Sequence, residues 1–177
     1  ENASIMGAYS LANEISALPT TELLAPLNRV LFPVFVNVSH DLTELKRVFL
    51  LAQGVQTLIG VPAGVGLALV ANEAVLLLLG GKWHSAVPLI QTIALVNVMT
   101  AIMTSGGYIL ITLGKVRIIA LYSWIQVGIF AALAFLVIPH GGALQIAWLR
   151  LIVAMVGVLV FIWLLLKELK GLRLIEL

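Results

Sequence analysis

Polar side chains recur at helical spacing near the start of the chain, in a segment otherwise rich in apolar residues. At about 100° per residue, seven of them project within an arc of roughly 140°. They are Tyr9, Ser10, Asn13, Ser16, Thr20, Thr21 and Asn28, and Glu14 lies at the edge of the arc. Because a polar stripe this broad is costly against lipid, we expect it to face protein or a water-filled cavity.

Two arginines could add positive charge to such a cavity. Glu22 and Arg29 lie seven residues apart on another common face. Either they form a surface or interfacial salt bridge, or Arg29 lines, with the stripe, a route for a polar anionic substrate. Arg150 lies about eight residues inside an apolar segment, where an arginine snorkels to the headgroups, pairs, or faces a cavity.

Residue patterns typical of catalysis or metal binding are missing from the sequence. His40, His84 and His140 fall in different loops, and the chain has no cysteine. The Gly80-Gly81-Lys82-Trp83 run lacks the upstream glycine and the following Ser or Thr of a phosphate-binding loop. We therefore expect no catalytic residue, no metal site and no cofactor, and an enzyme is not indicated.

The composition indicates that most of this chain lies in a lipid bilayer. Hydrophobic residues make up 62% of the 177 residues and charged residues 10%, and the mean hydropathy is +1.14. Soluble domains carry about 25% charged residues. The pattern predicts an all-α, polytopic transmembrane helix bundle. The expected helical segments are residues 5–38, 45–70 with a short helix at 72–79, 86–113, 116–138 and 143–169.

Segment length and loop charge predict how the chain crosses the membrane. A hydrocarbon core of about 30 Å needs about 20 helical residues, so every long segment after the first can span it. Seven basic residues fall in alternate breaks and the C-terminal tail: Lys46, Arg47, Lys115, Arg117, Lys167, Lys170 and Arg173. The other breaks hold only Lys82. This asymmetry predicts a multi-pass protein of a bacterial inner membrane with a cytoplasmic C-terminus. Basic residues dispersed in this way do not indicate nucleic-acid binding.

Several local features carry narrower predictions. Pro19, Pro26 and Pro33 predict kinks or breaks in the first segment. Either Asp41 or Thr43 is expected to cap the second helix.

Small and polar residues within the predicted spans suggest how the helices pack. The Gly60-xxx-Gly64 strip suits close helix contact. Asn97, Thr100 and Thr104 share one face of their helix, which favours interhelical hydrogen bonds. The isolated glutamines, among them Gln53 and Gln56, are expected to link helices.

The chain also resembles a known family over most of its length. The resemblance begins at Gly7-Ala8-Tyr9-Ser10-Leu11-Ala12 and continues through Pro26-Leu27-Asn28-Arg29-Val30-Leu31-Phe32-Pro33. It is most specific at Leu76-Leu77-Leu78-Leu79-Gly80-Gly81-Lys82-Trp83. These segments are similar to the polysaccharide biosynthesis, or O-antigen and exopolysaccharide flippase, branch of the multidrug/oligosaccharidyl-lipid/polysaccharide exporter superfamily.

The resemblance implies a transporter of two helical lobes around a central cavity, related as parallel repeats. Its substrate would be an undecaprenyl-pyrophosphate-linked oligosaccharide, moved to the periplasmic leaflet. The whole chain, residues 1–177, would be part of the C-terminal lobe, and its partners would be that substrate, membrane lipids and the missing N-terminal lobe. The start at Glu1-Asn2-Ala3 also indicates a piece of a longer chain. The cavity candidates are Tyr9, Asn13, Glu14, Asn28, Arg29 and Arg150.

Three other functions are weighed against this one. A multidrug-type cation antiporter would need acidic residues in the cavity to bind cations, rather than Arg29. A membrane polymerase or ligase usually carries a large extracytoplasmic loop, and the predicted loops here are a few residues long. A non-transporting scaffold leaves the polar stripe unexplained.

Overall fold

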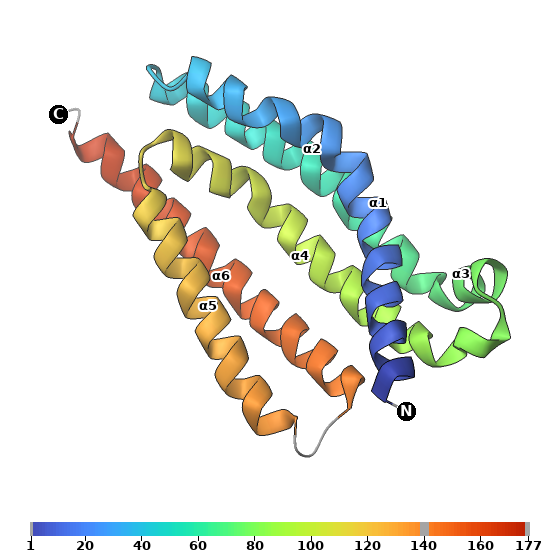
Figure 1. Cartoon of the computed structure of the whole chain (residues 1–177). Helices are drawn as coiled ribbons and strands as arrows, with labels where there is room; N and C mark the ends of the chain where they lie inside the picture. Colours follow the sequence, from blue (N-terminus) through green and yellow to red (C-terminus); the bar gives the residue numbers. More distant parts are fainter. Residues whose placement is uncertain (1, 139–141, 176–177) are drawn as a thin grey trace.

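A computed structural model of the chain describes residues 2–138 and 142–175, and within them it is built only of helices (Figure 1). The helices are α1 (Asn2–Asn37), α2 (Leu42–Leu69), α3 (Ala71–Leu78), the 3₁₀-helix η1 (Gly81–Ala86), α4 (Val87–Thr112), α5 (Val116–Val137) and α6 (Ala143–Ile175). The all-helical fold predicted from the sequence is confirmed.

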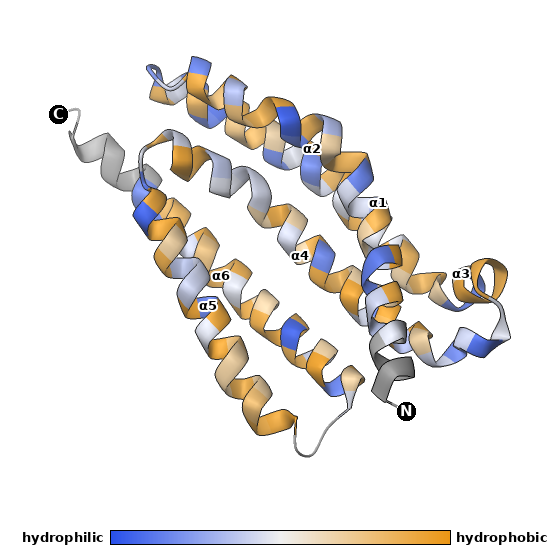
Figure 2. Cartoon of the chain, in the orientation of Figure 1, coloured by the Kyte–Doolittle hydropathy of each residue, from blue (hydrophilic) through white to orange (hydrophobic). Residues whose placement is uncertain are grey.

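Four helical stretches are long and apolar enough to cross a membrane, and α1 is not among them. They are Leu42–Leu69, Gly81–Thr112, Val116–Val137 and Ala143–Glu168. Figure 2 shows apolar residues along most of α5 and α6. Large apolar side chains such as Leu121, Phe135 and Leu159 are exposed on these two helices, as expected of surfaces that face lipid.

The first helix is continuous despite its three prolines, so the predicted break does not occur. Pro19, Pro26 and Pro33 all lie inside α1. Their seven-residue spacing places the rings on one face, and Pro26 and Pro33 are exposed. The helix is held along its length by α2 and α4, which offsets the backbone hydrogen bond that each proline removes.

The start of α2 is fixed by an aspartate cap. The Asp41 carboxylate Oδ1 accepts hydrogen bonds from the backbone N–H groups of Thr43 and Glu44, at 2.8 and 3.2 Å. Asp41 rather than Thr43 is therefore the cap, and it satisfies two donors that the first turn would leave unpaired.

The core of the bundle is α4, which packs against α1, α2 and α6, while α5 packs mainly on α6. The fully buried Ile90 and Ile93 anchor one end of α4, and Ile109 and Leu110 anchor the other. In Figure 1 the turns after α1 and α4 lie at one end of the bundle, and α3 and η1 lie at the opposite end. At the first of these ends, Lys115 Nζ lies 3.2 Å from a Glu168 carboxylate oxygen.

The predicted small-residue contact of α2 is confirmed at its interface with α4. A Cβ atom placed on Gly60 would lie 3.4 Å from the Ala101 Cβ, and one placed on Gly64 would overlap the Val98 side chain. Hydrogen alone at these positions lets the two backbones approach, as in other membrane helix pairs.

We expect Gly64→Ala to destabilise the bundle by about 1–3 kcal/mol, the usual cost of overpacking a core. The β-branched Val98 has little freedom to rotate away inside a helix. Gly54→Ala is the matched control, because Gly54 lies on the same helix with open space around its α-carbon. That change should stabilise α2 by roughly 0.5–1 kcal/mol. Unfolding of the purified protein in SDS measures both, and equal stability of the two variants would contradict the close contact.

Candidate functional site

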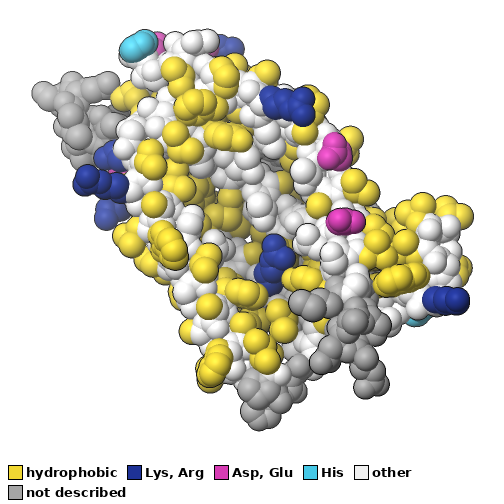
Figure 3. All heavy atoms as spheres, viewed as in Figure 1, with side chains coloured by type: hydrophobic (Ala, Val, Ile, Leu, Met, Phe, Trp, Pro, Cys, Tyr) yellow, Lys and Arg dark blue, Asp and Glu magenta, His cyan; other side chains and the backbone are white. Residues whose placement is uncertain are grey.

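A polar groove runs along α4 between α1 and α5, and Figure 3 shows this face of the molecule hollowed. Two cavities make up the groove, one of about 220 Å³ against α1 and one of about 260 Å³ against α5. Thr100 and Thr104 line both cavities. We call this feature the α4 groove.

The floor of the α4 groove is formed by Asn97, Thr100 and Thr104, which helical spacing places on one face. Their predicted interhelical hydrogen bonds do not form. The Thr100 hydroxyl donates to the Val96 carbonyl at 3.1 Å, and the Thr104 hydroxyl donates to the Thr100 carbonyl at 3.0 Å. Each threonine reaches back within its own helix because the cavities separate α4 from the facing helices.

Asn97 retains an unused donor in the groove. Its side-chain nitrogen Nδ2 is buried and has no hydrogen-bond partner among the described residues. Because an unpaired buried donor costs about 1–3 kcal/mol, this amide favours an acceptor from outside the chain.

The wall on the α1 side shows that the polar stripe predicted from the sequence is divided. Ser16 is fully buried, and its hydroxyl donates to the Ile90 carbonyl of α4 at 3.1 Å. Thr20 is also buried, although it lines the cavity together with the exposed Thr21. One edge of the stripe therefore packs against α4, and the other edge is open.

Asn28 lines the same wall and is oriented by a residue of α2. The nearly fully buried Gln56 donates from Nε2 to the Asn28 Oδ1 at 2.8 Å. With its oxygen engaged, Asn28 keeps its NH2 group as the donor available to a ligand. Gln53 similarly donates to the Ile102 carbonyl at 2.9 Å, so the helix-linking role predicted for these two glutamines is confirmed.

The second cavity is lined by Tyr122, Ser123 and Gln126 of α5. The sequence analysis did not single out Tyr122 and Ser123, and it expected Gln126, like the other isolated glutamines, to link helices. The signal in the sequence is that Tyr122 and Gln126 lie four residues apart, so they share one face of α5.

At the end of α4 near its N-terminus, two predicted candidates far apart in the sequence meet. Arg150 of α6 donates from Nη1 to the Tyr9 hydroxyl of α1 at 3.4 Å, and both side chains are partly buried. Tyr9 packs beside Ile90 and Ile93, which places this contact within the first two turns of α4, before Asn97. Arg150 thus reaches across the bundle to α1.

The Arg150 charge has no carboxylate beside it in the described part of the chain. The ion pairs found there join Arg47 to Glu44 and Lys115 to Glu168. A guanidinium without a counter-charge in an apolar bundle attracts an anion.

The remaining candidates stand apart from these contacts. Asn13, Glu14 and Arg29 are exposed, and none of the three lines either described cavity. The salt bridge considered between Glu22 and Arg29 does not occur among the ion pairs of the described residues. Seven residues rise about 10 Å along a helix, whereas contacts between helix side chains usually join positions three or four apart.

The histidines do not come together either. His40 follows α1 and His84 lies in η1, at opposite ends of the bundle, while His140 falls outside the described residues. No group of three metal-ligating side chains occurs in residues 2–138 and 142–175.

Comparison with known proteins shows which family the chain resembles. Residues 2–88, which cover α1 to η1 and the start of α4, match the family model described as polysaccharide biosynthesis protein. Over this part, just under half of its length, the chain is similar to the polysaccharide biosynthesis protein family. The resemblance read from the sequence is thereby confirmed, and the chain is a multi-pass membrane protein. Asn28 and Gln56 lie in the matched part of the family, and Asn97 and Arg150 lie beyond it.

Two relatives extend the comparison to nearly the whole chain, and a third covers half of it. The teichuronic acid biosynthesis protein TuaB of Bacillus subtilis is 26% identical over 95% of this chain and 35% of its own length. The lipopolysaccharide biosynthesis protein WzxC of Escherichia coli is 26% identical over 96% of this chain and 34% of its own. The succinoglycan biosynthesis transport protein ExoT of Rhizobium meliloti is 35% identical over 50% of this chain and 18% of its own.

The chain therefore spans about a third of the length of TuaB and WzxC. No solved structure matches it.

We expect the α4 groove to hold water in the full-length protein. In a cysteine-free background, Thr100→Cys and Thr104→Cys should react with a small charged thiol reagent, because water allows the thiolate to form. Leu159→Cys is the control, since Leu159 is 69% exposed on the apolar surface of α6 and should lie in hydrocarbon. Equal reaction rates at positions 100 and 159 would contradict a wet groove.

Proposed function

We propose that this chain forms one lobe of a transporter that moves lipid-linked oligosaccharide or polysaccharide repeat units across a bacterial inner membrane. The carrier lipid is an undecaprenyl pyrophosphate, and the α4 groove lines the route of the polar part. The single observation that carries the proposal is Arg150, a partly buried cation in an apolar bundle that has no ion pair among the described residues. The relatives TuaB, WzxC and ExoT are named for teichuronic acid, lipopolysaccharide and succinoglycan biosynthesis, which supports the substrate class.

The groups of the groove match the chemistry of that substrate. A guanidinium offers two parallel N–H donors to phosphate oxygens, which suits Arg150 to a pyrophosphate linkage. Glycan hydroxyls both donate and accept hydrogen bonds. The unpaired Asn97 nitrogen and the Asn28 NH2 group are donors for them, and Thr100 and Thr104 retain acceptor lone pairs.

The same groups argue against the alternatives. None of the residues that line the two described cavities is acidic, whereas a cation antiporter needs negative charge there. Binding and release of a sugar lipid need donors and acceptors rather than a nucleophile or general base, so we propose a transporter and not an enzyme. A non-transporting scaffold does not account for an open polar groove, because polar groups are costly within the membrane.

A complete route needs a second wall. We propose that the rest of the same polypeptide, about two thirds by comparison with TuaB and WzxC, packs over the α4 groove as the other lobe. Rocking of the two lobes as parallel repeats would open the route to each side in turn.

Arg150→Ala should lower glycan export by about ten- to one-hundred-fold in cells that make the full-length protein. The reason is the loss of a charged hydrogen bond worth about 1.5–3 kcal/mol. Arg150→Lys keeps the charge without the two-pronged geometry and should retain part of the export. Surface glycan and the amount of protein in the membrane are measured together. If Arg150→Ala and Tyr9→Phe instead lower the protein level alike, the contact is structural and the proposed role is wrong.

Arg29 remains a predicted substrate contact, and its exposed position makes the test simple. Arg29→Ala should reduce export without lowering the protein level, and Glu22→Ala, the matched control on the same face, should leave export unchanged. Normal export in Arg29→Ala would remove this residue from the site and leave Arg150 as its cation.

We propose that the end of the bundle at the α1–α2 and α4–α5 turns is cytoplasmic, because the basic loop residues gather there. The exposed His40 and His84 provide matched reporters at the two ends. In intact cells an impermeant thiol reagent should label His84→Cys and not His40→Cys. The reverse labelling would overturn the orientation.

A further inference from the structure

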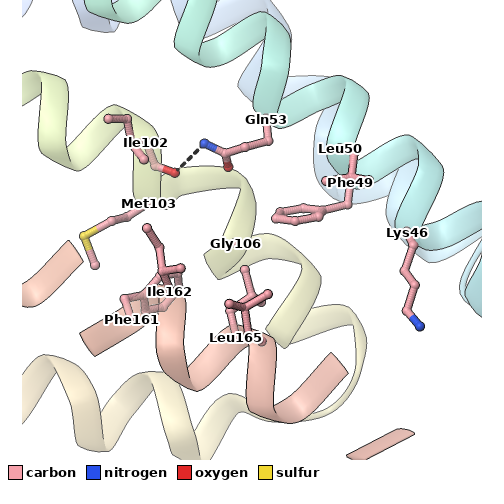
Figure 4. A pocket seen from close by; sticks show the side chains of 11 residues that line it. Lys46, Phe49, Leu50, Gln53, Ile102, Met103, Gly106, Phe161, Ile162 and Leu165 are labelled. Atoms are coloured by element: carbon pink, nitrogen blue, oxygen red, sulfur yellow. Dashed lines mark hydrogen bonds between the residues drawn. The ribbon is translucent and has the colours of Figure 1, made fainter. Parts of the chain in front are cut away.

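A second groove lies between α2 and α6, over α4, and it differs in character from the α4 groove. Its volume is about 440 Å³, within the range of about 300–1,000 Å³ that ligand pockets have. The apolar side chains that form most of its walls are Phe49, Leu50, Phe161, Ile162, Leu165 and Leu166 (Figure 4). We call it the α2–α6 groove.

The two grooves open on different faces of α4. Ile102 and Gly106 line the α2–α6 groove, and Thr100 and Thr104 line the α4 groove. At 3.6 residues per turn, the centres of these two sets lie about 160° apart around the helix. The two grooves adjoin at Met103 and Phe161, which line both, but a sugar held by Thr100 and Thr104 would lie on a different face of α4 from a chain held at Ile102 and Gly106.

The polar groups beside the α2–α6 groove are already paired with each other. Gln53 donates from Nε2 to the Ile102 carbonyl at 2.9 Å, and the Ser105 hydroxyl donates to the Gln53 Oε1 at 2.5 Å. Figure 4 shows the first of these bonds at the edge of the groove. With both ends of the Gln53 amide used, the walls suit a hydrocarbon chain and not a sugar.

Lys46 is the exception, and it gives the groove a charged end. It lies one turn into α2, partly buried, and lines the groove beside Phe49. Its neighbour Arg47 pairs with Glu44 at 3.5 Å, but Lys46 has no ion pair among the described residues. At the end of the bundle where Lys46 lies, Arg47 and Lys115 are paired with Glu44 and Glu168. Lys46 and Arg117 have no ion pair among the described residues, so these two charges favour anions there.

We propose that the α2–α6 groove binds an anionic phospholipid, with an acyl chain along its walls and the phosphate beside the Lys46 ammonium. A lysine one turn from a helix end reaches the headgroup layer while its stem stays in hydrocarbon. The inference needs only that the chain spans a membrane, and it does not depend on the proposed transport function.

Tryptophan quenching by brominated lipids tests this assignment without any transport assay. In the full-length protein, Trp83, Trp124, Trp148 and Trp163 are replaced by Phe, any tryptophan elsewhere is removed, and Leu50→Trp places one reporter in the groove. The protein is reconstituted with mixtures of phosphatidylglycerol and phosphatidylcholine, one of them brominated in its chains. Phosphatidylglycerol should bind about five-fold more tightly at this site, the effect of one basic residue near anionic lipid.

Two charge variants and a second reporter complete the design. Lys46→Gln should abolish the preference, and Arg47→Gln, its matched control, should keep it because the Arg47 charge is already compensated by Glu44. Lys46→Arg should also keep the preference for phosphatidylglycerol. This result would show that the loss in Lys46→Gln comes from the missing charge and not from a folding defect. A reporter from Leu159→Trp, on the lipid-exposed surface of α6, should show no preference.

Four results would overturn the proposal. Equal quenching by the two lipids at position 50 would exclude an anionic site, and a preference that survives Lys46→Gln would exclude Lys46 as its cause. No quenching by either lipid would show that a further part of the polypeptide or a second copy covers the groove. Relief of quenching by a small fraction of undecaprenyl phosphate would assign the groove to the carrier lipid.

Discussion

The hydrocarbon core supplies no water to polar groups, and a buried amide or hydroxyl without a partner there costs several kcal/mol. This constraint accounts for where the polar residues of the bundle lie. Ser16, Gln53 and Gln56 sit at helix contacts and bond across them. Two groups are less fully satisfied: the Asn97 nitrogen makes no hydrogen bond among the described residues, and Arg150 bonds to Tyr9 but has no ion pair among them. Both groups favour contact with water or a ligand in the complete protein.

The central helix separates two chemical environments. Toward α1 and α5 it presents the Asn97 amide and the Thr100 and Thr104 hydroxyls, and Arg150 of α6 reaches across the bundle to Tyr9 of α1. Toward α2 and α6 it presents Ile102 and Gly106 in an apolar groove with one lysine at its end. The proposed transport of sugar lipids would use both properties, because such a cargo is polar in its glycan while the protein itself is surrounded by lipid. The close contact at Gly60 and Gly64 holds α2 against α4, so that these faces keep their relative orientation.

Much of the fold can be predicted from the sequence because it depends on signals within single elements. Run length predicts the long helices, the Asp41 side chain predicts the start of α2, and the Gly60–Gly64 spacing predicts a packing face. The site depends instead on which helices become neighbours and how each is rotated. Arg150 meets Tyr9 from 141 positions away, a contact that no local pattern contains. The Thr100 and Thr104 hydroxyls donate to carbonyls of their own helix, because cavities separate them from the facing helices. The spacing of the two threonines in the sequence does not predict those cavities.

Substrate protection in the full-length protein tests the central claim most directly, namely that the α4 groove receives the polar part of the cargo. The reaction of Thr100→Cys with a charged thiol reagent is timed in vesicles with and without lipid-linked oligosaccharide extracted from the producing cells. We predict that the lipid-linked oligosaccharide slows the reaction at position 100 and leaves that of His84→Cys, in η1 outside the groove, unchanged. Equal rates at position 100 with and without it would contradict the account.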